Sequence, residues 1–310
     1  MGMMIQGKWT EDAKDIRMQD GQFVRQSSQF TKIRQAVPPR PEPGQFHLFS
    51  SWSCPWSQRA MIARNLMGLE SIVTMSAAWG PRIEGYSISN GENYPVPGTN
   101  MEARFLHEIY RLSLPDYTGR VTVPVLWDAT GHEILSNESS DIVWWFNQLG
   151  SSDAGTPDLF PSELEAEIKL FNDRIYTGLT NAVYEAGNAE KQDVYAAKAE
   201  KVAATLVWLD GELADRSFAL TSSITVCDVY LIPSLLRFTA IYEPLFKCNL
   251  RPLRTLPNVC RYIHQMMEMD AIRSTFDLHK SKVGYYLDKK LNPNMTIPLG
   301  PLDLEWRMNS

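Results

Sequence analysis

The stretch SWSCPWSQRA, residues 51–60, places a cysteine just ahead of a proline and a tryptophan and between two polar runs. Pro55 suits the first turn of a helix, so Cys54 stands where a helix starts. Helix starts have unpaired N–H groups and a partial positive charge, and both favour a thiolate over a thiol. The thiolate is the nucleophilic form. A lone cysteine is more often buried and inert, but the polar neighbours of Cys54 favour a nucleophile.

The motif has no second thiol. Ser57 stands where a two-cysteine redox site has its resolving cysteine, so Cys54 cannot close a disulfide within the motif. Any mixed disulfide that Cys54 forms must be resolved by a thiol from outside the protein, and glutathione is the abundant cytosolic candidate. The motif therefore indicates a glutathione-dependent thiol-transfer enzyme.

The elements around Cys54 alternate between strands and helices. The run FHLFSS (46–51) predicts a buried strand, and WSQRAMIARNLMG (56–68) predicts a helix that stops at Gly68. The sequence then predicts a strand over 71–76, a long irregular loop over 77–100, a helix over 101–113, strands over 121–128 and 132–136 around a turn at Gly131, and a helix over 137–149. Pro124 makes the strand 121–128 begin at the proline or lie at an edge. The order predicts an α+β domain that ends in a hairpin and a helix.

The second half of the chain is helical in pattern from 160 to about 280. Its clearest predicted helices cover 161–176, 196–213, 226–242 and 259–274. We therefore expect an N-terminal extension (1–43), an α+β domain (44–150), an all-helical domain (151–285) and a C-terminal tail (286–310). The extension ends in VPPRPEPG, which suits neither helix nor central strand.

Composition narrows the possible partners. The formal net charge of −6, from 30 basic and 36 acidic residues, argues against a nucleic-acid or anionic-membrane partner. Neither an apolar signal segment nor a run of membrane-spanning length is expected. The four cysteines lack the spacing of a disulfide framework or a zinc site, so no metal is expected. Cys227 and Cys260 lie in apolar helical patterns and predict buried thiols. A reducing cytoplasm is the expected location.

Several segments together resemble the glutathione transferase superfamily. They are CPW (54–56), GRVTVPVLWD (119–128), NESSDIV (137–143), MIQGKW (4–9), RIYTGLTNAVYEAG (174–187), LRFTAIYEPLFKC (236–248) and LNPNMTIPLGP (291–301). Within that superfamily the chain is similar to the glutathionyl-hydroquinone reductases, or Xi-class transferases. The resemblance implies a thioredoxin-like N-terminal domain followed by an all-α domain, a homodimer, and glutathione as the co-substrate. In this family the cysteine attacks the sulfur of a glutathionyl-hydroquinone, releases the hydroquinone, and forms a mixed disulfide that a second glutathione resolves.

The resemblance also implies glutathione contacts, at Tyr86, Arg120, Val123, Pro124, Glu138 and Ser139. A cis Pro124 would let Val123 bond the cysteinyl group of glutathione. The helix that Glu138 and Ser139 open would hold the γ-glutamyl carboxylate, and Glu138 its ammonium group. Ordinary helix capping is compatible with this reading. A solvated loop charge is the alternative for Arg120.

The substrate contacts that the resemblance implies are tyrosines. Tyr184 and Tyr242 match the hydroquinone-pocket tyrosines, whose phenols can donate to the phenolate oxygen of the leaving hydroquinone as the carbon–sulfur bond breaks. The alternative interpretation is that both are core tyrosines whose hydroxyls are already hydrogen-bonded within the protein. The last pocket tyrosine of the family falls on Gly284, so either the adjacent Tyr285 takes its role or the pocket is incomplete.

The chain departs from the family at further positions. Ser57 and Gln58 stand where alanine and histidine are usual, and Tyr86 replaces a loop tryptophan, for which Trp79 lies too early. Two alternatives to a hydroquinone reductase therefore stay open. One is an omega-like thioltransferase or dehydroascorbate-type reductase. The other is a non-catalytic protein that binds glutathione or an aromatic ligand.

Overall fold

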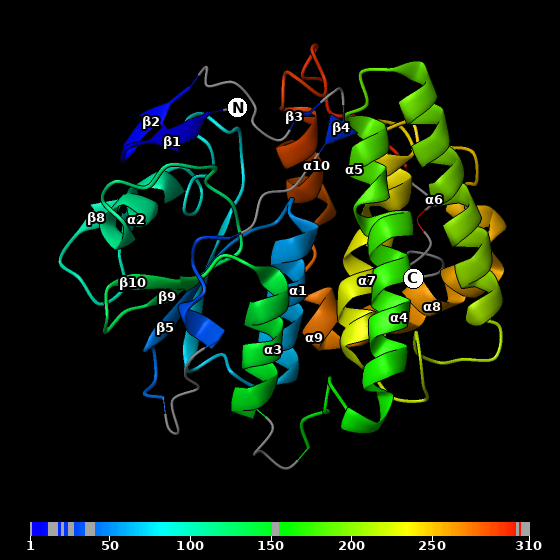
Figure 1. Cartoon of the computed structure of the whole chain (residues 1–310), viewed down its shortest axis with the longest axis horizontal. Coiled ribbons are helices and arrows are strands. Elements are labelled where there is room, and N and C mark those ends of the chain that lie inside the picture. Colours follow the sequence, from blue (N-terminus) through cyan, green and yellow to red (C-terminus); the bar gives the residue numbers. More distant parts are fainter. Residues whose placement is uncertain are drawn as a thin grey trace. The chain divides into compact units, whose positions relative to one another are not determined.

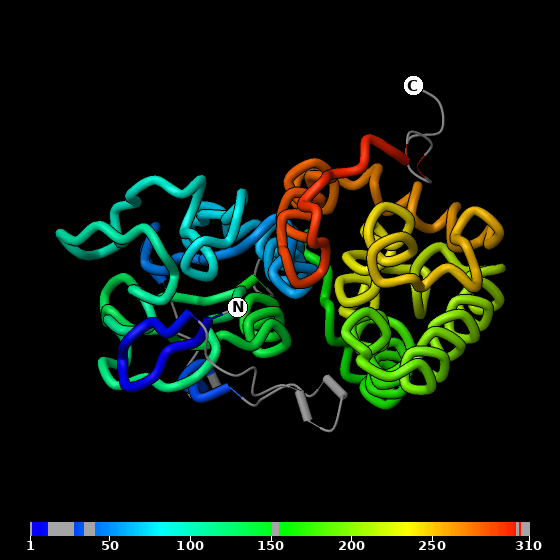
Figure 2. The backbone as a smooth tube through the Cα atoms, turned by 90° about the horizontal axis from the view of Figure 1, so that it is seen from above, coloured from blue at the N-terminus to red at the C-terminus, as the bar shows by residue number. Residues whose placement is uncertain are grey.

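The structure is a computed structural model that describes residues 2–11, 18–19, 22–23, 28–34, 41–150, 155–301 and 304. Parts of the predicted extension and of the predicted tail lie outside these residues. The chain divides into two compact units (Figures 1 and 2). The first comprises Met1–Asp15, Ser27–Thr156 and Thr275–Asp288, and the second comprises Ile16–Gln26, Pro157–Ser274 and Lys289–Ser310.

A four-stranded mixed sheet forms the centre of the first unit. Its order is β10–β9–β5–β6, with the bounds β5 (Phe46–Ser51), β6 (Val73–Ala78), β9 (Val125–Asp128) and β10 (Glu133–Ser136). β5 is parallel to β6 and antiparallel to β9, which forms an antiparallel pair with β10. The strand predicted over 46–51 is confirmed as β5, and the hairpin predicted near the end of the α+β domain is confirmed as β9 and β10. The arrangement is the thioredoxin-like fold.

In the part of the first unit that the structure describes, the α-helices are α1 (Pro55–Leu66), α2 (Leu106–Ser113), α3 (Ser139–Gly150) and α10 (Leu278–Tyr286). Figure 1 shows α1 and α3 side by side next to the sheet, whereas α2 packs against β8 (Glu102–Ala103) and β10. Phe46 on β5 meets Trp145 on α3 edge to face, with ring centroids 4.9 Å apart. Two buried aromatic rings thus join the sheet to the helix layer.

Short elements complete the first unit. β1 (Met3–Ile5) and β2 (Lys8–Thr10) form a hairpin, β7 (Tyr94–Pro95) pairs with β8, and η1 (Lys32–Arg34) is a single 3₁₀ turn. The β1–β2 hairpin is attached to the rest of the unit by a bridge between Met4 and Gly119.

The second unit is helical, apart from the short hairpin of β3 (Met18–Gln19) and β4 (Gln22–Phe23). Its helices are η2 (Ser162–Leu164), α4 (Glu165–Ile175), η3 (Tyr176–Thr180), α5 (Ala182–Gly187), α6 (Gln192–Glu212), α7 (Val226–Arg237), η4 (Phe238–Tyr242), η5 (Leu253–Thr255), α8 (Pro257–Glu268) and α9 (Asp270–Arg273). Figure 2 shows several of them end-on, as a bundle. None of the helices in the described residues is both long and apolar enough to cross a membrane.

A capping box starts α7. The Oγ1 of Thr225 accepts from the backbone N–H of Cys227, and the Asp228 carboxylate accepts from the N–H of Thr225 at 2.8 Å. The carboxylate also accepts from the hydroxyl of Tyr262 at 2.9 Å. Asp228 is fully buried, so these bonds replace the water that its carboxylate loses on folding.

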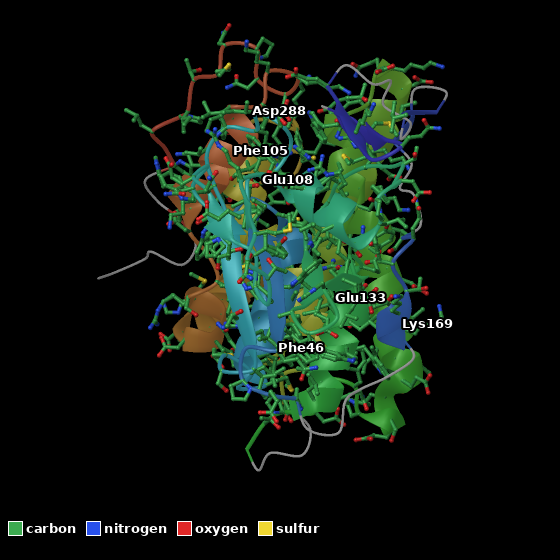
Figure 3. All side chains as sticks on the ribbon, turned by 90° about the vertical axis from the view of Figure 1, so that its left-hand side faces the viewer. Phe46, Phe105, Glu108, Glu133, Lys169 and Asp288 are labelled. Carbon is green, nitrogen blue, oxygen red and sulfur yellow. The ribbon has the colours of Figure 1, made fainter. Side chains whose placement is uncertain are left out.

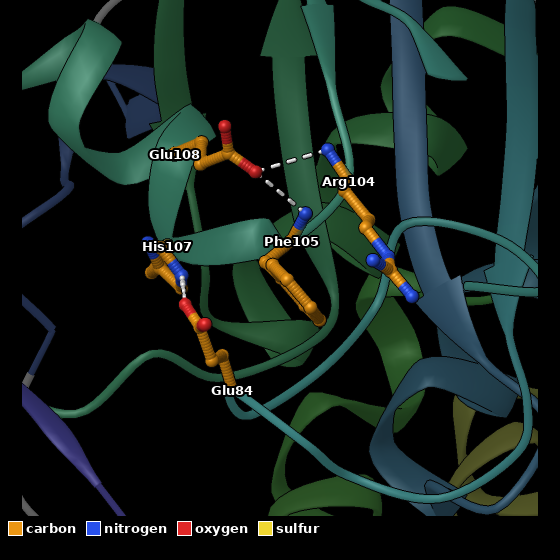
Figure 4. Close-up of polar contacts among 5 residues, drawn as sticks. All are labelled: Glu84, Arg104, Phe105, His107 and Glu108. Atoms are coloured by element: carbon orange, nitrogen blue, oxygen red, sulfur yellow. Dashed lines mark hydrogen bonds and ion pairs between the residues drawn. The ribbon is translucent and has the colours of Figure 1, made fainter. Parts of the chain in front are cut away.

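Some predicted boundaries are wrong for identifiable reasons. The helix predicted over 101–113 begins only at Leu106, because Glu102–Ala103 pair with β7 and the Glu108 carboxylate accepts from the N–H of Phe105 at 2.8 Å (Figure 4). The helix predicted over 259–274 breaks at Met269, whose backbone is extended (φ −79°, ψ 117°).

The strands shift as well. The strand predicted over 71–76 runs instead from Val73 to Ala78, and the loop predicted over 77–100 contains β7. The strand predicted over 121–128 begins after Pro124, which has no N–H to give to a ladder. Cys227 is buried as predicted, but Cys260 is partly exposed, and its thiol donates to the carbonyl of Leu253 at 3.2 Å.

Candidate active site at the start of α1

Cys54 is the N-cap residue of α1. Its backbone is extended (φ −89°, ψ 117°), and its sulfur accepts from the N–H of Ser57 at 3.4 Å. The sulfur therefore takes up one of the amides that a helix start leaves unpaired. A thiolate at this position gains from the same N–H and from the helix dipole. The structure thus places Cys54 where the sequence predicts it, with only 8% of its surface exposed.

Val123 and Pro124 face this cysteine. The peptide bond between them is cis, as the resemblance implies. The Cys54 thiol donates to the carbonyl oxygen of Val123, with 3.6 Å between sulfur and oxygen. The contact joins the start of α1 to the residue that precedes β9. The backbone carbonyl of Val123 therefore lies beside the Cys54 sulfur.

Glu138 and Ser139 lie at the start of α3. The N–H of Glu138 donates to Ser136 Oγ at 3.0 Å, and the carbonyl of Glu138 accepts the first helical bond, from Ile142. Ser139 is almost fully buried, and its Oγ has no hydrogen-bond partner in the described part of the chain. A buried hydroxyl without a partner is unusual. At a helix start, it suits a bound carboxylate, which fits the γ-glutamyl end of glutathione.

Arg120 is buried rather than solvated. It is 9% exposed, and its carbonyl accepts from the hydroxyl of Tyr117 at 2.9 Å. The reading of Arg120 as a solvated loop charge is therefore wrong. Arg120 remains a candidate contact of glutathione, because it is buried in the same unit as Cys54 and lies close in sequence to the cis Val123–Pro124 pair.

Tyr86 is half-buried and packs against the cluster of core side chains that includes Cys54 and Val123. Its carbonyl accepts from the N–H of Leu106, the first residue of α2, at 2.9 Å. The guanidinium of Arg82 lies over the Tyr86 ring, 4.4 Å from its centroid. Arg82 is the residue of this site that sequence reasoning missed, because no motif marks it.

Helix α10 returns to the first unit from the end of the chain. Gln58 Nε2 donates to Thr275 Oγ1 at 3.2 Å, just before α10, and Ser281 Oγ donates to the carbonyl of Trp52 at 2.8 Å. Both bonds hold α10 against the residues that flank Cys54. Gln58 and Ser57 are fully buried, so the polar surroundings of Cys54 are an interior polar layer and not a solvated surface.

Gly284 and Tyr285 lie on α10. A Cβ atom at Gly284 would lie 2.4 Å from Cβ of Ser53, so the position has no room for a side chain. Tyr285 is 5% exposed and lies in the same unit as Cys54. The tyrosine that the family has at Gly284 could not be accommodated with α10 in this place.

Tyr184 and Tyr242 meet each other in the second unit. Their hydroxyl oxygens are 3.2 Å apart, and both rings contact Phe246. Tyr184 lies on α5, which follows the π-helix η3, and Tyr242 is the last residue of the π-helix η4. Single π turns inside helices often mark functional sites. The structure thus brings these two tyrosines together, while Tyr285 belongs to the other unit.

No cluster of three or more histidine, cysteine, aspartate or glutamate side chains suited to a metal ion occurs in the described residues. Cys227 and Cys248 are also buried thiols. Burial raises the pKa of Cys227 and of Cys248 to about 12, so both stay protonated near neutral pH. Neither suits nucleophilic chemistry.

Comparison with known proteins gives a consistent result. The family models of the glutathione S-transferase N-terminal and C-terminal domains match residues 53–149 and 192–264. The chain is 35% identical to the glutathionyl-hydroquinone reductase PcpF of Sphingobium chlorophenolicum, over 97% of this chain and 96% of the relative. It is 31% identical to the glutathione S-transferase omega-like 2 of Schizosaccharomyces pombe, over 93% of this chain and 96% of the relative.

Solved structures agree. The glutathione S-transferase Xi of Phanerochaete chrysosporium superposes with a TM-score of 0.83 at 31% identity, covering 91% of this chain and 94% of that one. The glutathione-bound structure of YqjG, a glutathione transferase homologue from Escherichia coli K-12, has a TM-score of 0.81 at 30% identity, covering 90% and 94%. With both domain models matched and the likeness extending over nearly the whole chain, this protein belongs to the glutathione S-transferase family, alongside its Xi-class members.

Proposed function

We propose that this protein is a glutathione-dependent reductase of glutathionyl-hydroquinones or related aryl glutathione conjugates. The observation that carries the proposal is the place of Cys54, at the N-cap of α1 with its sulfur 3.6 Å from the carbonyl of Val123. The name of the PcpF relative, a glutathionyl-hydroquinone reductase, supports the substrate class. A transferase that only conjugates glutathione is less suited, because a cysteine here would trap glutathione as a disulfide.

The proposed reaction has two steps. The Cys54 thiolate attacks the glutathione sulfur of the conjugate, and an S–S bond forms as the bond from sulfur to the ring carbon breaks. The ring carbon keeps the electron pair, takes a proton and leaves as the hydroquinone, so the ring is reduced and the sulfur is oxidised. The thiolate of a second glutathione then attacks the mixed disulfide, releases glutathione disulfide and returns Cys54 as a thiolate.

The glutathione contacts in this proposal come from the first unit. Ser139 and the start of α3 hold the γ-glutamyl carboxylate, and Glu138 holds the ammonium group. The backbone of Val123, after which Pro124 is cis, bonds the cysteinyl part. Arg120 and the Tyr86 ring complete the set. The buried, unpartnered Oγ of Ser139 among the described residues supports this assignment.

The tyrosines act on the leaving ring in this proposal. Tyr184 and Tyr242 share a hydrogen bond between their hydroxyls, so the phenol that accepts this bond keeps its own proton for a hydroxyl oxygen of the departing ring. Tyr285 replaces the tyrosine for which Gly284 has no room. A homodimer and a cytoplasmic location, where glutathione is abundant, belong to the same proposal.

A turnover assay tests the proposal. Wild-type protein with glutathionyl-menadiol and excess glutathione should release menadiol. Intact mass after one equivalent of substrate should show a transient glutathione adduct, localised to Cys54. Cys54→Ser should abolish turnover and keep glutathione binding. Turnover by Cys54→Ser would refute the mechanism.

An omega-like thioltransferase or dehydroascorbate-type reductase is the second candidate, favoured by the likeness to the omega-like transferase of S. pombe. In that case the adduct would form but turn over only with generic disulfides. A protein that forms neither adduct nor product would be a binding protein.

A further inference from the structure

Arg82 places a positive charge beside the residue that precedes Cys54. Its Nη2 donates to Ser53 Oγ at 3.4 Å, and Ser53 Oγ also contacts Ser51 Oγ at 3.1 Å. The guanidinium carbon also lies over the Tyr86 ring, 4.4 Å from its centroid, a favourable cation–π distance. Arg82 therefore connects two parts of the proposed site, the Cys54 loop and the glutathione-covering Tyr86.

Between Arg82 and Tyr86, the segment is attached to α2 through Glu84. Glu84 accepts from His107 Nε2 at 3.1 Å (Figure 4). The His107 ring is itself stacked on Trp9, with centroids 5.1 Å apart and planes at 19°, and on Phe105 at 5.7 Å and 12°. An aromatic stack thus supports the anchor between Arg82 and Tyr86.

Backbone contacts fix the same segment on its C-terminal side. The carbonyl of Tyr86 accepts from Leu106 at 2.9 Å, and the N–H of Ile88 donates to the carbonyl of Arg104 at 3.0 Å. Gly85 has a positive φ of 73°, and a Cβ there would lie 2.9 Å from the Trp9 ring. The segment is therefore pre-organised, and the charge of Arg82 has a fixed place relative to Cys54.

The groups that face Arg82 keep it ionised. Burial alone lowers its pKa, but Tyr86, Asp288, Tyr285 and Cys54 together raise the pKa above its ordinary value. Asp288 follows the end of α10 and is labelled in Figure 3. Because the guanidinium bonds Ser53, which directly precedes Cys54, it attracts negative charge on a ligand that reaches Cys54. Asp288 is the counter-charge that moderates this attraction.

We propose that Arg82 is a specificity-determining residue, which makes the Cys54 site prefer substrates that carry negative charge next to the sulfur under attack. The inference rests on the proposed function and deepens it. The favoured substrates are aryl glutathione conjugates with an ionised ring substituent, such as a carboxylate or an acidic phenol. Neutral rings bind without this contribution.

Alkylation of Cys54 by a matched pair of reagents tests the inference. Iodoacetate and iodoacetamide both react with the thiolate, so the ratio of their rates cancels the thiolate fraction and reports the local potential. Digestion and mass spectrometry separate the labelling of Cys54 from that of Cys260, which is partly exposed. In Arg82→Gln the iodoacetate-to-iodoacetamide ratio should fall about three- to ten-fold, the order expected for one nearby unit charge.

Three further variants test the sign and the place of the effect. Arg82→Lys keeps the charge and should keep most of the ratio, whereas Asp288→Asn removes the counter-charge and should raise the ratio. Arg104→Gln is the matched control, because Arg104 is an exposed arginine of the same unit and also lies over an aromatic ring, 5.2 Å from the centroid of Phe105. Its ratio should equal that of the wild type.

The outcomes separate the inference from the proposed function. An unchanged ratio in Arg82→Gln, or a fall of equal size in Arg104→Gln, would overturn the role of Arg82. If neither reagent labels Cys54 in the wild type, the proposed function itself fails. If Arg82→Gln does not fold, a ratio in Asp288→Asn at or below that of the wild type would overturn the inference. In turnover, Arg82→Gln should lower kcat/KM for a ring-carboxylated conjugate several-fold more than for its neutral analogue.

Discussion

Gly284 shows how closely α10 approaches the cysteine loop. A Cβ atom at this position would lie 2.4 Å from Cβ and 2.6 Å from Oγ of Ser53, which is closer than real Cβ atoms approach one another. Ser53 directly precedes Cys54, so any side chain at 284 must displace the loop or the helix. The absent tyrosine is therefore coupled to the packing of α10 and is not an isolated change.

Gly284→Ala should destabilise the protein by about 1–3 kcal/mol, the usual cost of overpacking. The shift of Ser53 should also move Cys54 away from the N–H of Ser57 and slow its alkylation by iodoacetamide. Urea unfolding and the alkylation rate measure the two effects. Gly211→Ala is the control, because a Cβ at Gly211 in α6 meets nothing within 4 Å. That variant should be more stable by up to about 0.5–1 kcal/mol, with alkylation unchanged. A Gly284→Ala protein as stable as the wild type would show that the loop yields freely.

Local chemistry made Cys54 predictable from the sequence. A cysteine before a proline at a strand-to-helix junction is expected at a helix N-terminus from local sequence alone, and Cys54 is the N-cap of α1 in the structure. Arg82 was not predictable, because its partner Ser53 is 29 residues away and no spacing rule joins them. The contact of Gln58 with Thr275 spans 217 residues. Side chains that depend on such long-range packing leave no local signal.

At the scale of elements, a buried histidine joins β5 to β6. His47 on β5 contacts Thr74 Oγ1 at 2.8 Å and Ser76 Oγ at 3.0 Å, both on β6. Burial, and secondarily the charge of Arg64, lower the pKa of His47 to about 3. The ring is therefore neutral in the folded protein over a pH range in which it is protonated in the unfolded chain.

This difference in pKa predicts acid sensitivity. The unfolded chain binds a proton at His47 below about pH 6.5 and the folded protein does not, so stability present above pH 6.5 is lost as the pH falls toward 3. The loss is up to about 1.4 kcal/mol for each pH unit. His47→Gln should be less stable at pH 7 but should lose less between pH 6.5 and 4.5, as measured by urea unfolding at each pH.

His264→Gln is the control for that experiment. His264 is exposed on α8, so its removal should leave the pH dependence of the wild type intact. Equal slopes in His47→Gln and the wild type would mean that folded His47 takes up a proton as readily as the unfolded chain does.

Element types were predictable where the pattern was strong, and boundaries were not. The run FHLFSS has apolar residues at three of its first four positions and forms β5 at its predicted bounds. The start of α2 depends instead on the carboxylate of Glu108 and on the pairing of β7 with β8. Both are contacts that the helical pattern of 101–113 does not contain. The break at Met269 likewise interrupts a pattern that is helical throughout.

At the scale of the whole molecule, the order of elements was enough to predict an α+β part followed by a helical part. The glutathione transferase fold was implied by the resemblance of segments such as GRVTVPVLWD and NESSDIV to that family. The order of elements could not predict that Thr275–Asp288 would belong to the first unit. A chain segment that returns after a whole helical domain is positioned by packing alone, since its own helical pattern suits either unit.

Glutathione should stabilise the whole chain through the first unit. A ligand that binds only the folded protein raises the free energy of unfolding by about 2.7 kcal/mol at a hundred times its Kd. The Cys54→Ser variant excludes a mixed disulfide, so urea unfolding of this variant with and without reduced glutathione isolates reversible binding. Adding Glu138→Gln removes the charge proposed to meet the ammonium group, and the stabilisation at the same glutathione concentration should shrink. Adding Glu133→Gln instead removes a carboxylate that pairs with Lys32 at the end of the sheet, and the stabilisation should stay. Equal stabilisation in all three proteins would mean that glutathione is held without Glu138, and the γ-glutamyl end would then have to be placed elsewhere.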